Sequence, residues 1–90
     1  MAKKRDLKRA INYVCNDLFA ETVAASLYGS NKNKDAVDQT LASIIVLRDD
    51  YIKRISHPEP GMSPQKYYSE IIKEFNTQVL EIIEQIKTLG

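Results

Sequence analysis

Few residues of this 90-residue chain are of the types that perform nucleophilic, acid–base or metal chemistry. The single histidine is His57, which precedes Pro58, and the single cysteine is Cys15. Two soft ligands are fewer than the four that structural zinc uses, so we expect no metal and no cofactor. A phosphoacceptor histidine lies in mid-helix, whereas we expect His57 at an exposed helix C-terminus. We expect Cys15 to be a small buried hydrophobe.

Two pairs of carboxylates are spaced closely enough for comparison with acid–base pairs. Asp49 and Asp50 are adjacent, so on a helix they point about 100° apart. Glu81 and Glu84 flank two isoleucines, which places them on an outer, solvated helix face. The sequence contains no Ser-His-Asp arrangement, no phosphate-binding loop and no metal-ligand spacing.

One class of enzyme, the all-helical chorismate mutases, has a similar length and helix count. That resemblance requires an arginine in the middle of the first helix and a Lys/Arg pair converging in the core. This chain has no cation between Arg9 and Lys32, so an anionic dicarboxylate would find no clamp. We therefore expect no enzymatic activity and no small-molecule substrate.

Positive charge gathers near the start of the chain, although the formal net charge is only +1. In an antiparallel bundle the same end receives the last turn of the second helix. The candidate anion-binding set is then Lys3, Lys4, Arg5, Lys8, Arg9, Lys53 and Arg54. The alternative is a solvated tail at 3–5, with Lys53 and Arg54 merely complementing the dipole of their own helix. The near-neutral total supports nucleic acid only weakly as a partner, and it does not support a membrane surface.

Three apolar stripes must position all of these side chains. Apolar residues recur at i, i+3, i+4 and i+7, which predicts helices over 5–28, 35–56 and 64–89. The composition is 43% hydrophobic and 28% charged, which is typical of a globular protein and predicts one domain over 1–90. No stretch approaches 18 uncharged apolar residues, so no membrane span is expected. Short connections favour an all-α, up-down-up antiparallel three-helix bundle.

The residues between the stripes have the chemistry of helix ends. Gly29 and the polar turn after it are expected to end the first helix, and Asn33 or Asp35 to cap the second. Prolines break the chain after the second helix, and Ser63 with Pro64 is expected to begin the third. In the same loop region, Met62 and Tyr67 are expected either to cap the core or to form an exposed patch with Tyr13.

The first helix carries more apolar surface than one core-facing stripe needs. The residues beyond its main seam on one flank are Ala10, Tyr13, Ala20, Ala24 and Leu27. Either this helix sits deepest in the bundle, or the flank is buried in a homodimer or against another protein. The second helix similarly adds Val46 and Leu47 outside a seam that includes Ile44 and Ile45. A helix that is apolar nearly all round is normally covered on more than one side.

The opening KKRDLKRAINYVCNDLFAE has a basic start, an Ile-Asn-Tyr step and an acid-Leu-Phe run. In these features it resembles a group of short bacterial helical proteins with no known activity. The resemblance implies a small cytoplasmic all-α protein and transfers no functional residue. No apolar segment follows the basic start, so a signal peptide is not expected. We expect a non-enzymatic bundle that acts through protein–protein contacts, above all with itself, with anion or nucleic-acid binding as the alternative.

Overall fold

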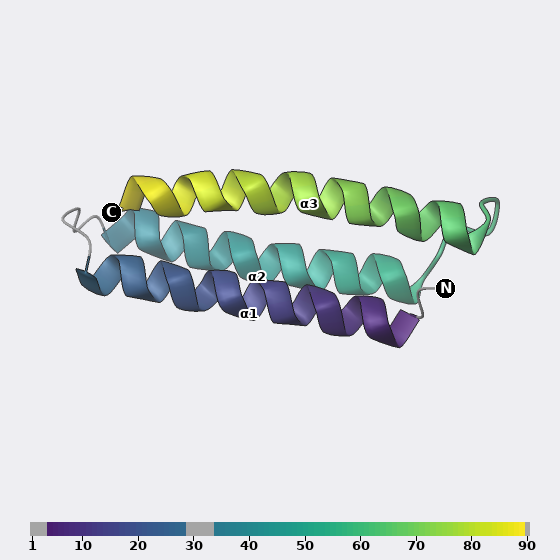
Figure 1. Cartoon of the computed structure of the whole chain (residues 1–90), viewed down its shortest axis with the longest axis horizontal. Helices are drawn as coiled ribbons and strands as arrows, with labels where there is room; N and C mark the ends of the chain where they lie inside the picture. The colour runs from purple at the N-terminus through teal and green to yellow at the C-terminus, as the bar shows by residue number, and fades with distance from the viewer. Residues whose placement is uncertain (1–3, 29–33, 90) are drawn as a thin grey trace.

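The structure is a computed structural model that describes residues 4–28 and 34–89. The described residues form three helices, α1 (Lys4–Tyr28), α2 (Lys34–Ser56) and α3 (Pro64–Leu89). These helices lie side by side in a rod of 48 × 18 × 16 Å (Figure 1). The predicted all-α three-helix bundle is therefore confirmed.

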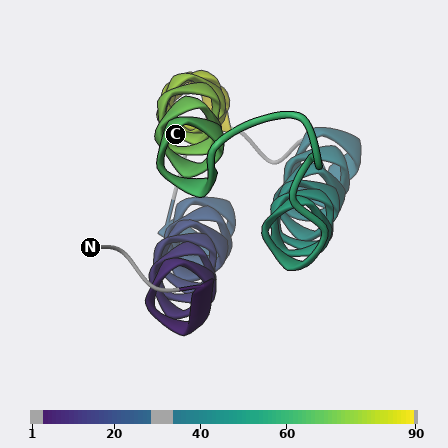
Figure 2. The ribbon, with the colours of Figure 1, turned by 90° about the vertical axis from the view of Figure 1, so that its right-hand side faces the viewer.

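The helices run up, down and up. The start of α1, the end of α2 and the start of α3 lie at one end of the rod (Figure 1). A hydrogen bond from Lys4 Nζ to the Ser56 carbonyl oxygen, 3.5 Å long, joins the first two of these termini. Viewed end-on, the three helices stand at the corners of a triangle (Figure 2). Each helix contacts both others, and the start of α1 shares one end of the rod with the end of α2.

The helix ends follow local sequence chemistry. At the start of α3, the Ser63 hydroxyl accepts a 3.4 Å hydrogen bond from the Lys66 backbone N–H, and Pro64 is the first helical residue as predicted. Asp35 lies in the first turn of α2, because the helix begins one residue earlier than expected; it is not the N-cap. The predicted ends at Gly29 and Asn33 lie outside the described residues.

The core runs along the axis of the rod, where one stripe from each helix is buried. At its centre, Tyr51 of α2 meets Phe75 of α3 edge to face, with ring centroids 5.3 Å apart. Cys15 is 2% exposed, which confirms its prediction as a small buried hydrophobe. The buried cluster consists of Leu7, Ile11, Cys15, Leu18, Ile44, Leu47, Tyr51, Ile55, Ile71, Phe75 and Ile82.

The buried stripe of α2 differs from the prediction. Leu47 was expected outside the seam but is only 4% exposed, and Ile45 was expected inside it but is 41% exposed. Because α2 packs against both other helices, its buried stripe turns toward α3, where Leu47 lies near Ile82. Ile45 is left at the outer edge of the contact with α1, beside Phe19.

Two threonines are also part of the interior. Thr22 and Thr40 are 0% and 3% exposed, and their hydroxyls donate to the carbonyl oxygens of Leu18 and Ala36 at 2.8 and 2.9 Å. Each hydroxyl is thus satisfied within its own helix. Apolar periodicity overlooked both residues because it counts hydrocarbon side chains only.

Two tyrosines of α3 close the end of the core at the basic end. The Tyr67 hydroxyl donates to the Arg54 carbonyl oxygen at 2.8 Å, and the Tyr68 hydroxyl donates to that of Ile55 at 3.5 Å. Both tyrosines are partly buried. Of the two alternatives for Tyr67, the structure supports the end cap, because a hydroxyl satisfies a carbonyl that the last turn of α2 leaves without a partner. Tyr13 does not line the small cavity beside Tyr67.

Candidate contact surface

The outer face of α1 consists of Ala10, Tyr13, Ala20, Ala24 and Leu27, and all five residues are exposed. Tyr13 is 76% exposed and Leu27 63%. At about 100° per residue, Tyr13 and Leu27 point roughly opposite to the buried Leu18. Neither neighbouring helix covers this face, so the bundle itself does not account for its apolar character.

Other exposed apolar side chains occur on all three helices, and on α1 itself they are Phe19, Val23 and Tyr28. Val46 on α2 is 67% exposed and Leu80 on α3 is 63% exposed. Apolar residues scattered singly over a surface are normal in folded proteins. On α1, by contrast, two large exposed side chains share one face with three alanines between or beside them. This grouping distinguishes the outer face of α1. Leu80, which lies outside the group, is therefore a suitable control residue for substitutions of Leu27.

A small cavity of about 270 Å³ separates α1 from α2 beside Cys15. Burial raises the pKa of the Cys15 thiol, and the Arg48 guanidinium lowers it by a smaller amount. Arg48 itself is ion-paired with Asp49 at 3.2 Å. A thiol held protonated in this way is a poor nucleophile. Cys15 therefore serves as a packing residue, and the cavity beside it is not a reactive site.

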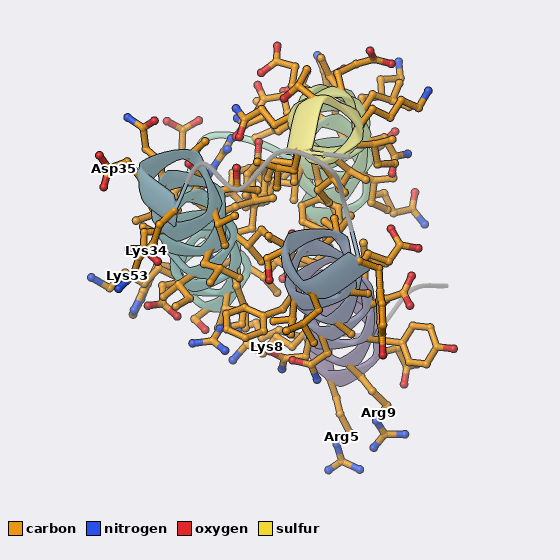
Figure 3. The ribbon with its side chains drawn as sticks, turned by 90° about the vertical axis from the view of Figure 1, so that its left-hand side faces the viewer. Arg5, Lys8, Arg9, Lys34, Asp35 and Lys53 are labelled. Atoms are coloured by element: carbon orange, nitrogen blue, oxygen red, sulfur yellow. The ribbon has the colours of Figure 1, made fainter. Side chains whose placement is uncertain are left out.

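The cations predicted for the basic end differ in their surroundings. Arg5 and Arg9 point away from the bundle (Figure 3). Arg5, Arg9 and Lys53 are exposed and Lys8 is partly exposed. Within the described residues, the ion pairs involve Arg48, Arg54 and Lys87, so none is formed by these four. Lys3 lies outside the described residues.

Arg54 belongs to the scaffold more than to the basic surface. Its guanidinium bonds the Glu74 carboxylate at 2.6 Å and lies over the Tyr51 ring, 4.8 Å from the centroid. The hydrogen bond to Glu74 raises the pKa of Arg54 further. Its inclusion in the anion-binding set is therefore not supported, since the charge already has a partner in α3.

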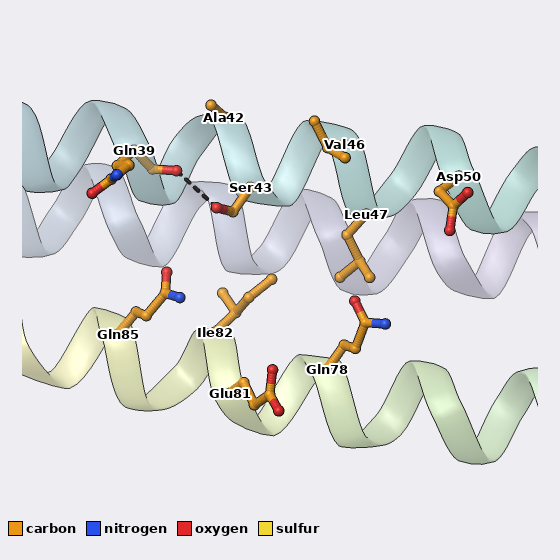
Figure 4. Close-up of a pocket in the computed structure, with 10 residues that line it drawn as sticks. All are labelled: Gln39, Ala42, Ser43, Val46, Leu47, Asp50, Gln78, Glu81, Ile82 and Gln85. Carbon is orange, nitrogen blue, oxygen red and sulfur yellow. Dashed lines mark hydrogen bonds between the residues drawn. The ribbon is translucent and has the colours of Figure 1, made fainter.

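A groove that the sequence analysis did not anticipate runs between α2 and α3 and has a volume of about 510 Å³ (Figure 4). Its polar lining comes from Gln39, Ser43, Asp50, Gln78, Glu81 and Gln85. Three of these lie on α2 and three on α3, at spacings of three, four or seven residues within each helix. That second, polar periodicity beside the apolar stripes is the signal that could have revealed the groove.

Two hydrogen bonds fix side chains of this groove. The Ser43 hydroxyl donates to the Gln39 carbonyl oxygen at 2.9 Å (Figure 4). The Gln78 amide donates to the Tyr51 hydroxyl at 3.1 Å. Through Gln78, an amide of the groove is hydrogen-bonded to the buried aromatic pair. The groove is lined by amides, one hydroxyl and two carboxylates.

Neither a cluster of metal ligands nor a membrane-spanning helix is found in the part of the chain that the structure describes. No three His, Cys, Asp or Glu side chains come together there in a way that could hold a metal ion. None of the three helices has both the length and the apolar character needed to cross a bilayer. Comparison with protein families, with curated proteins and with solved structures gives no match to this chain. A function must therefore be argued from the surfaces themselves.

Proposed function

We propose that this chain is a non-enzymatic helical bundle that acts through protein–protein contacts and associates with itself through the outer face of α1. The observation that carries the proposal is the exposure of Tyr13 and Leu27 on the side of α1 opposite the core. The exposed alanines of the same face let a second backbone approach closely. A two-fold dimer uses one patch twice and is the commonest closed assembly.

The dimension of the face predicts a weak dimer. The 25 residues of α1 extend over about 37 Å. A contact made by one helix face falls at the small end of protein interfaces, below about 1,200 Å². Such contacts form and dissociate readily, so we expect the dimer fraction to depend on concentration.

Size-exclusion chromatography with light scattering tests this proposal. The protomer mass is 10.3 kDa, and the concentrated wild type should approach twice that mass and fall on dilution. Leu27→Gln should stay at the protomer mass. The matched control is Leu80→Gln, which replaces a leucine of the same 63% exposure on α3 and should behave as the wild type. A wild-type mass that stays near 10.3 kDa at every concentration overturns the proposal.

The same proposal assigns the protein no substrate and places it in the cytoplasm. The sequence has one cysteine, so that residue has no partner for an intramolecular disulfide, and its side chain is buried. A domain of this kind suits a reducing compartment. Fractionation of cells that produce the protein tests the proposed compartment. The protein should be recovered with cytoplasmic markers.

A second candidate function is binding of nucleic acid or another polyanion at the basic end. The favouring observation is that Arg5, Lys8, Arg9 and Lys53 form no ion pair within the described residues (Figure 3). Phosphate contacts by such groups weaken as salt concentration rises. Filter retention of DNA and RNA should be measurable at about 50 mM salt and lost at higher salt.

Two variants make this second test specific. Arg5→Gln removes a charge of the basic end and should reduce retention. Lys87→Gln, at the far end of the rod, is the control and should leave retention unchanged. Absence of retention at low salt dismisses nucleic acid as a partner.

A further inference from the structure

Two large side chains of the outer face of α1 lie at equal distances on either side of a small one. Tyr13 and Leu27 each lie seven residues from Ala20, which is about 10.5 Å along the helix. If a second α1 is laid antiparallel across this face with a two-fold axis at Ala20, Tyr13 of each copy meets Leu27 of the other. The two copies of Ala20 meet at the axis, where their size permits close approach. This one register therefore pairs the two large side chains of the face and brings the two copies of Ala20 together.

The charges along α1 favour the same arrangement. Arg9 and Leu27 are 18 residues apart, about five full turns, so both point out of the same side of the helix. Within one protomer, a cation near the N-terminus of α1 opposes the helix dipole, and the last turn of α1 contains no basic residue. In the antiparallel pair, Arg9 of one copy lies beside the C-terminal end of the other α1, where a cation is stabilising.

The direction of the pair also decides which charges of α1 meet. An antiparallel pair holds the arginines of the two copies at opposite ends of the contact. A parallel pair would instead place Arg5 and Arg9 of the two copies together.

From these observations we infer that the partner of the outer face of α1 is a second copy of the chain, bound antiparallel with a two-fold axis at Ala20. This inference rests on the proposed function and adds to it the register and the direction of the dimer. Tyr13 fills the space beside Leu27 of the second copy, and Arg9 caps the C-terminal end of the second copy's α1.

Disulfide cross-linking tests the register. In a Cys15→Ala background, Ala20→Cys should form a disulfide-linked dimer on mild oxidation, because helices that pack across small residues bring such positions within bonding distance. An equimolar mixture of Tyr13→Cys and Leu27→Cys should give a disulfide-linked mixed dimer in clear excess of the 1:2:1 ratio of random pairing, because neither homodimer places two cysteines opposite each other in this register. The control is Thr77→Cys on α3, which is exposed but off the face and should remain monomeric.

Arg9→Gln tests the charge contacts without touching the apolar ones. Two equivalent contacts are lost per dimer, so the dissociation constant from light scattering should rise about 3- to 30-fold. Lys53→Gln, on α2, is the matched control and should change it little.

The outcomes separate the inference from the proposed function. A dimer that cross-links through Ala20→Cys and weakens in Arg9→Gln supports both. A wild-type dimer that neither cross-links at Ala20→Cys nor responds to Arg9→Gln overturns the antiparallel register but leaves self-association intact. A wild-type chain that is monomeric at all concentrations overturns both.

Discussion

Replacing the exposed Gln78 is expected to cost more stability than removing the hydroxyl of the buried Tyr51. Tyr51 is 0% exposed, and its hydroxyl oxygen accepts a 3.1 Å hydrogen bond from Gln78 Nε2. Tyr51→Phe leaves the ring against Phe75, and the released amide of Gln78 can turn to water in the α2/α3 groove. The expected loss is about 0.5–1.5 kcal/mol, the net value of one hydrogen bond.

Gln78→Met keeps the length of the side chain but removes the donor. The Tyr51 hydroxyl then stays buried without this partner, which costs about 1–3 kcal/mol. In the double variant Tyr51→Phe/Gln78→Met both groups are gone, so it should be more stable than Gln78→Met alone. The matched control is Gln85→Met, which makes the same replacement in the same groove and should cost under about 0.5 kcal/mol.

Urea unfolding followed by circular dichroism gives the free energy of unfolding of the wild type and the four variants, and thermal midpoints provide a second measurement. For a domain of this size, 1 kcal/mol corresponds to about 4–8 °C in Tm. If Gln78→Met costs no more than Gln85→Met, or if the two single changes are additive in the double variant, the hydroxyl keeps another partner, either water in the groove or the neighbouring Arg54 guanidinium. The reasoning about an unpaired buried group would then be wrong.

Three further predictions concern buried groups. Thr22→Val should leave stability unchanged or raise it by up to about 1 kcal/mol in urea unfolding, because the lost hydroxyl bonds only a carbonyl of its own helix; a loss above about 2 kcal/mol would contradict this. Cys15 should react with a thiol reagent at pH 8 far more slowly in the folded than in the urea-unfolded chain, because burial limits access and raises its pKa; equal rates would contradict it. Burial is also the main cause that raises the pKa of Tyr51, so its stabilising contribution is complete below the ordinary tyrosine pKa of about 10 and is lost as pH rises toward the folded value. Tyr51→Phe should therefore lose less stability than the wild type between pH 9 and 11, which thermal midpoints measure.

The helices could be predicted closely from the sequence because their ends carry strong local signals. The third helix begins at Pro64, as its Ser-Pro step indicates, and the first two begin one residue earlier than expected. The buried stripe of α1 was also predictable, since Leu7, Ile11 and Leu18 recur at helical spacing on one side.

The position of α2 between its neighbours could not be predicted in the same way. The angle between the contacts of α2 with α1 and with α3 decides whether Ile45 or Leu47 is buried. The apolar periodicity of one helix gives no information about that angle. Thr22 and Thr40 were missed for a different reason, because a threonine that bonds its own helix behaves as a core residue. The exposure of Tyr13 could be predicted only from the whole bundle, because the placement of α2 and α3 decides which flank of α1 they cover.

The tyrosine cap at the end of α2 also bears on how the chain may be redesigned. Because Tyr67 and Tyr68 tie the beginning of α3 directly to the carbonyls of α2, the proline-rich connector does not by itself hold the two helices together. At Gly61 the connector is exposed, and an added Cβ would meet no atom within 4 Å. A fluorescent label or a guest peptide grafted after Gly61 would thus hang from the tip of the rod and leave the helical faces untouched.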